Sequence, residues 1–162
     1  MISDSPYHSG ELALRPGEGV VAGIAGSFLM LAAVSALDPG SSGSGSLWIE
    51  WLGRLYAGAA ESRGVPGLVV HGLLGAVLGV LYAASQQRIP RRPLLGIGAF
   101  YGLLLWIGGR IMLGWLFSTP VRDVVHSWVW LAGACVFGIT LALSAAWADA
   151  RRPTTAVSVP RD

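Results

Sequence analysis

Three polar side chains lie within or beside otherwise apolar stretches of this 162-residue chain, and they are its best candidates for chemistry. His71 follows one proline by five residues, His126 follows another by six, and Arg110 interrupts the apolar run between them. Paired imidazoles can ligate a haem iron, and an arginine fork can hold a propionate or a phosphate. These three residues are therefore candidate ligands for a haem, a quinone head group or a lipid phosphate.

The same residues also have a structural interpretation, which we favour. Histidines within helices can hydrogen-bond neighbouring helices, and a long arginine side chain can reach the membrane surface. The two histidines also have different surroundings, because Gly72 follows the first while Ser127 and Trp128 follow the second. We therefore predict no cofactor and no metal, with a haem or a quinone as the alternative.

Other signatures of catalysis are missing from the sequence. No carboxylate lies in the middle of an apolar run, where proton and cation pathways usually place one. No histidine–cysteine cluster has zinc spacing, and neither a nucleotide-binding glycine motif nor a serine nucleophile elbow occurs. We expect a protein that is not an enzyme by itself.

Four apolar runs must position the three polar residues. The chain is 53% hydrophobic and 12% charged, whereas soluble domains carry about 25% charge. Each run matches the roughly 20 residues that a helix needs to cross a bilayer. We predict an all-α membrane protein with four transmembrane helices in one domain. The spans are residues 18–37, 66–85, 94–117 and 120–148, between polar tails at 1–17 and 149–162.

The four spans are predicted to form two tandem hairpins. Each half has a glycine-rich span, a connection, a proline, a histidine and a second span. Small residues four apart, such as Gly19 with Gly23 and Gly75 with Gly79, let helices approach closely in lipid. Because each half holds an even number of spans, we expect the halves to be related by an axis along the membrane normal.

One further helix is predicted in the first connection, at residues 47–62. Its apolar residues recur at helical spacing on one face, but the segment is too short and too polar to span. This pattern is typical of an amphipathic helix lying in the membrane interface. We expect its apolar face to contact lipid or a partner subunit, through Trp48 and Trp51.

The layout resembles small four-helix bacterial inner-membrane proteins of unknown function, including the YagU-like group. In those proteins a glycine-rich span is followed by a span that opens with histidine and then G-x-x-x-G. The matching residues here are Gly19–Gly23 and Val70-His71-Gly72 with Gly75–Gly79, echoed by Val125-His126-Ser127. The resemblance implies a fold and carries no activity.

The distribution of arginine predicts the orientation in the membrane. Seven arginines lie on the side of the two tails and three on the other side, and cytoplasmic loops carry the excess of positive charge. We predict a bacterial inner-membrane protein with both termini in the cytoplasm. The seven are Arg15, Arg88, Arg91, Arg92, Arg151, Arg152 and Arg161, and the three are Arg54, Arg63 and Arg122.

Arg110 is expected to meet a counter-charge, because a charge at the centre of a span costs about 2.5–3.5 kcal/mol on insertion scales. Asp123 is our first choice, since a short turn joins the third and fourth spans. Asp38 and Glu61 are the other candidate acids on that side, and a lipid phosphate is the alternative.

The function that these observations favour is a non-catalytic accessory or structural subunit of a larger membrane complex. An electron-transfer complex, respiratory or photosynthetic, is our first choice. The expected partners are other membrane-protein subunits and phospholipid, and no nucleic acid. The alternatives are a haem- or quinone-binding protein that uses His71, His126 and Arg110, and a small transporter or channel.

Overall fold

The computed structural model describes residues 14–39, 43–57, 64–86, 94–116, 124 and 127–151. Five α-helices and no strand lie within these residues. They are α1 (Pro16–Leu37), α2 (Ser44–Ala57), α3 (Gly64–Gln86), α4 (Leu94–Leu116) and α6 (Trp128–Ala150). All except α2 are long and apolar enough to cross a membrane. The predicted all-α fold is confirmed, and the chain is a multi-pass membrane protein.

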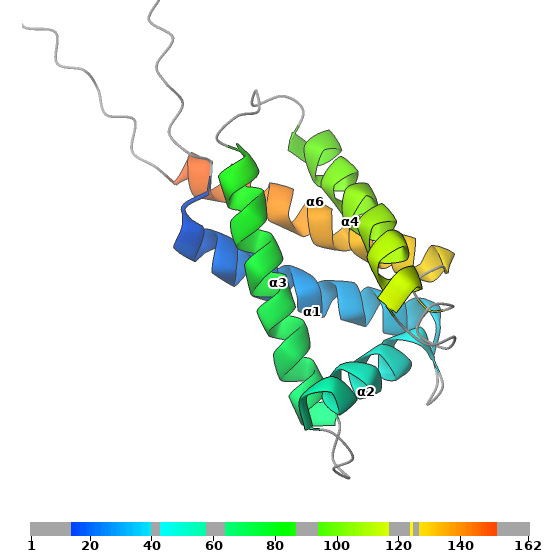
Figure 1. Cartoon of the computed structure of the whole chain (residues 1–162). Helices are drawn as coiled ribbons and strands as arrows, with labels where there is room; N and C mark the ends of the chain where they lie inside the picture. The colour runs from blue at the N-terminus through cyan, green and yellow to red at the C-terminus, as the bar shows by residue number, and fades with distance from the viewer. Residues whose placement is uncertain are drawn as a thin grey trace, which may run out of the picture.

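The two spans of the first half, α1 and α3, cross with their backbones in contact (Figure 1). A Cβ added to Gly23 would overlap the carbonyl oxygen of Gly75, and one added to Gly79 would overlap that of Gly19. Lipid tails are as apolar as leucine, so helices in a membrane associate through close packing of this kind. The small residues four apart are therefore the surface that holds α1 against α3.

The second half is built in the same way, from α4 and α6. A Cβ on Gly98 would overlap the carbonyl oxygen of Gly138, and a Cβ on Gly102 would overlap that of Ala134. The four described spans thus form two close-packed helix pairs, each with a small-residue contact at its crossing point.

These contacts define which residues of the two halves correspond. Gly19 faces Gly79 in the first pair, and Gly98 faces Gly138 in the second. Residues of α4 therefore lie 79 positions after their counterparts in α1, and residues of α6 lie 59 positions after theirs in α3. The second small residues fit the same offsets, because Gly102 follows Gly23 by 79 positions and Ala134 follows Gly75 by 59.

The contact register corrects the repeat that we expected from proline and histidine. His71 and His126 were predicted to be counterparts, but an offset of 59 makes Trp130 the counterpart of His71. The difference is about one helical turn. Contact between small residues sets the register, because a shift of α6 would place larger side chains at the crossing point.

The two halves join through α1 and α6. A Cβ on Gly26 would press against the ring of Phe137, so this glycine allows α6 to approach. Its counterpart in α4 is Leu105, which is too large for an equally close approach between α3 and α4. Those two helices make far fewer contacts with each other, and the Tyr101 hydroxyl connects them by donating to the Leu78 carbonyl at 2.8 Å.

Most predicted helix starts lie within three residues of the observed ones, and the fourth span is the exception. We expected it to begin at residue 120, but α6 begins at Trp128. The side chain of Ser127 accepts a hydrogen bond from the backbone N–H of Trp130 at 3.2 Å, which makes Ser127 the helix cap. Residues 120–123 lie outside the described part of the chain.

Candidate functional site

His71 lies on α3 at the junction of three helices and is 5% exposed. The indole N–H of Trp48, on α2, donates to its Nδ1 at 3.1 Å. Its Nε2 lies 2.9 Å from the backbone carbonyl oxygen of Ser27, on α1. Only a neutral ring with its proton on Nε2 satisfies both contacts, since indole can only donate and a carbonyl can only accept. Both ring nitrogens are therefore engaged in joining α1, α2 and α3.

The alternative in which His71 pairs with a second imidazole to hold a haem is not tested by the structure. His126 lies outside the described residues, although Val124 and Ser127 on either side of it are described. At the position in α6 that corresponds to His71, the repeat places Trp130, whose ring centroid lies 4.9 Å from that of Trp48. The internal repeat therefore brings a tryptophan, and not a second histidine, to the equivalent place.

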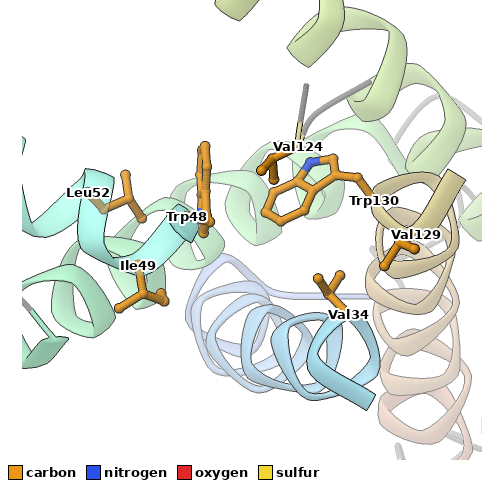
Figure 2. Close-up of a cluster of buried hydrophobic side chains, with 7 residues drawn as sticks. All are labelled: Val34, Trp48, Ile49, Leu52, Val124, Val129 and Trp130. Atoms are coloured by element: carbon orange, nitrogen blue, oxygen red, sulfur yellow. The ribbon is translucent and has the colours of Figure 1, made fainter. Parts of the chain in front are cut away.

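Trp48 lies inside the protein, which corrects our prediction that it contacts lipid or a partner. It is 7% exposed and belongs to the buried cluster in Figure 2, where its ring faces that of Trp130. Trp51, the other predicted contact residue, is half-buried and stacks on Trp48 with the ring centroids 5.2 Å apart. The exposed apolar side chains of this helix include Leu55 and Tyr56 instead.

Two contacts hold the apolar face of α2 against the rest of the protein. A Cβ on Gly67 of α3 would overlap the backbone carbonyl of Ile49, so the glycine allows α2 to lie directly on α3. At the start of α2, the Asp38 carboxylate accepts hydrogen bonds from the backbone N–H and the hydroxyl of Ser44, at 2.8 and 2.5 Å. The hydrogen bond from the Ser44 side chain, followed by the one from its backbone, lowers the pKa of Asp38. Helix α2 is thus tied to α1 at one end and to α3 along its length.

Arg110 is exposed on α4 and is not among the contacts of His71. Its Cζ lies 4.7 Å from the centroid of the Trp106 ring, within the range of a cation–π interaction. Asp38, one of the acids that we considered as its partner, bonds Ser44 instead. Asp123 and Glu61 lie outside the described residues, so the expected pair with Asp123 stays a prediction.

The four spans differ greatly in burial, which the sequence analysis missed. Within the most apolar stretch of α4, 11% of the residues are buried, against 28% in α1, 44% in α3 and 50% in α6. Apart from its packing against α6 and the contact of Tyr101 with α3, this helix presents large side chains outward. We define the outer face of α4 by four of them, Phe100, Leu104, Ile107 and Ile111, which are 59%, 48%, 40% and 61% exposed.

No catalytic or metal-binding cluster emerges in the part of the chain that the structure describes. No group of three or more histidine, cysteine, aspartate or glutamate residues there has the geometry to hold a metal ion. The polar side chains whose contacts are known mainly cap helices or join them. These polar contacts position the helices. Contacts with other molecules must therefore be made by the exposed surfaces of the helices.

Comparison with known proteins identifies one family. The model of a family of unknown function (DUF6789) matches residues 15–156, which include all five helices. No curated protein and no solved structure shows significant similarity to the chain.

Proposed function

Because the chain belongs to DUF6789, a family of unknown function, we propose its role from its own geometry: a non-catalytic accessory subunit that packs into a larger membrane complex. The observation that carries this proposal is the low burial of α4, 11% over its most apolar stretch. The other three spans are held more fully by the chain itself. Helix α4 is therefore the span with the most surface to offer a partner.

The outer face of α4 has the pattern of a helix-packing surface. Phe100, Leu104, Ile107 and Ile111 follow one another at intervals of four, three and four residues. Apolar residues at this spacing form the seam through which side chains of two helices interdigitate. We propose that a transmembrane helix of another subunit lies along this seam.

The contacts of His71 favour this role over haem binding. Ligation of iron by His71 would require one of its two hydrogen bonds to break, and with it the junction of α1, α2 and α3. A bacterial inner-membrane complex of electron transfer remains our proposed setting, chosen by analogy with large complexes that carry small helical subunits. The YagU-like layout and cytoplasmic termini, the latter inferred from the arginine distribution, belong to the same proposal.

The proposal can be tested with two double variants that are matched in exposure. Phe100→Ala with Ile111→Ala trims the outer face of α4, where the side chains are 59% and 61% exposed. Leu73→Ala with Val77→Ala trims α3 at side chains that are 60% and 58% exposed.

The tagged chains are extracted from native membranes in mild detergent and sized. We expect a large complex from the parent and the α3 variant, and a smaller one from the α4 variant. A parent chain that migrates as a lone monomer would contradict the proposal.

A further inference from the structure

We propose that Arg110, held against Trp106, binds the phosphate of an anionic phospholipid at the flank of α4. The guanidinium is exposed, and no carboxylate of the described residues pairs with it. The phosphate takes the place of Asp123, the counter-charge that we expected from the sequence, which lies outside the described residues. A cation in that position on a spanning helix requires a counter-charge or water. This site is distinct from the outer face of α4, because Arg110 lies about a quarter turn from the centre of that face.

The cation–π contact with Trp106 holds the guanidinium in place for an anion-binding contact. The indole ring is itself packed against the buried cluster of Figure 2, so it is a fixed support. A cation–π contact does not use the N–H groups along the guanidinium edge as hydrogen-bond donors to an oxygen, so the contact itself leaves them able to bind an anion. A phosphate accepts two parallel hydrogen bonds from such an edge.

The depth of Arg110 suits a lipid head group. Arg110 precedes Leu116, the last residue of α4, by six positions, which is about 9 Å along the helix axis. An arginine side chain can extend toward the interface over part of that distance while its methylene groups stay in contact with apolar surface. Leu103, two turns before Arg110 on the same side of α4, is exposed and offers apolar surface to an acyl chain outside the outer face.

The internal repeat shows why this position is open. The counterpart of Arg110 in α1 is Leu31, which is partly buried in the region that α2 covers, and the start of α2 at Gly45 lies near it. No described helix covers α4 in the corresponding way. At these equivalent positions, the residue that α2 covers is a leucine and the residue that no described helix covers is an arginine. A phosphate site that faces lipid requires such an uncovered arginine.

The experiment uses the full chain in nanodiscs of phosphatidylcholine that contain a minor fraction of phosphatidylglycerol. After extraction into detergent, the retained phosphatidylglycerol per protein is measured by native mass spectrometry. We expect Arg110→Gln to lower retention about tenfold and Arg110→Lys to lower it less, because lysine keeps the charge without the fork. Arg54→Gln is the matched control, since Arg54 is an exposed arginine with its own carboxylate, Glu50, at 3.8 Å.

Equal phosphatidylglycerol retention by the parent and by Arg110→Gln would overturn the proposal, as would equal loss in the Arg54→Gln control. Binding of free inorganic phosphate with the same dependence on Arg110 would show a phosphate site that is not lipid-specific, and would also overturn it. Monodispersity of each variant in detergent establishes that the fold is kept. No partner subunit is present in this experiment, so its outcome is independent of the proposed accessory role.

Discussion

Replacing Trp48 with phenylalanine should weaken the junction of α1, α2 and α3 by a measurable amount. The variant keeps an aromatic ring in the buried cluster but removes the N–H that donates to Nδ1 of His71 at 3.1 Å. Because His71 is 5% exposed, water cannot readily replace that donor. A buried acceptor left unsatisfied costs about 1–3 kcal/mol, and the lost indole contacts add to this. We expect the free energy of unfolding to fall by about 2–3 kcal/mol.

The assay is reversible unfolding of the purified chain in mixed micelles as the fraction of denaturing detergent rises. Trp128→Phe is the control, because Trp128 is 67% exposed and its replacement should change stability by less than about 0.5 kcal/mol. In a His71→Leu background, Trp48→Phe should cost less, since removing both partners of a hydrogen bond is cheaper than removing one. Equal effects of Trp48→Phe and Trp128→Phe would refute the reasoning, as would an unchanged cost in the His71→Leu background.

Four further outcomes are expected. Gly23→Ala should destabilise the chain by about 1–3 kcal/mol through overpacking at the α1–α3 crossing, whereas Gly108→Ala, where an added Cβ meets open space, should be neutral or slightly stabilising in the same unfolding assay. The lowered pKa of Asp38 stabilises the fold above its unfolded-state pKa of about 3.9, so that contribution should disappear as the pH falls through the folded-state pKa. Limited proteolysis between α1 and α2 should report this loss of stability, and Asp38→Asn should remove its pH dependence. His71→Ala and His126→Ala should leave the visible absorption of the purified protein unchanged, and loss of a haem band in either would favour the cofactor interpretation. A reporter enzyme fused to the C-terminus should be active in its cytoplasmic form, and activity only in the periplasm would reverse the topology.

The spans were predictable because hydrophobic length is a direct physical requirement of the bilayer. The sequence also indicated the surfaces through which α1 and α3 meet. Gly19 with Gly23 and Gly75 with Gly79 have the spacing at which helix backbones can approach closely. The register of the repeat was not predictable from proline and histidine. Those residues mark the starts of helices, whereas the register depends on which small residues face each other across the crossing.

The main error in the prediction from sequence concerned what the apolar face of α2 packs against. An amphipathic pattern identifies the residues on one face of a helix but not what covers that face. Membrane lipid and the ends of α1 and α3 are both apolar, so Trp48 suited either surroundings. The signal that could have decided between them was Gly67, which allows close approach of α2, together with the indole donor and the acceptor on His71.

The most direct test of the proposed accessory role is photo-crosslinking in native membranes. A photoreactive amino acid is placed at Ile107 on the outer face of α4, or at Val77 on α3, which is also exposed. After irradiation, we expect a protein adduct of one defined mass from position 107, and none of that mass from position 77. If position 107 gives only lipid adducts, or if both positions give the same products, α4 is not the surface by which this chain joins a complex.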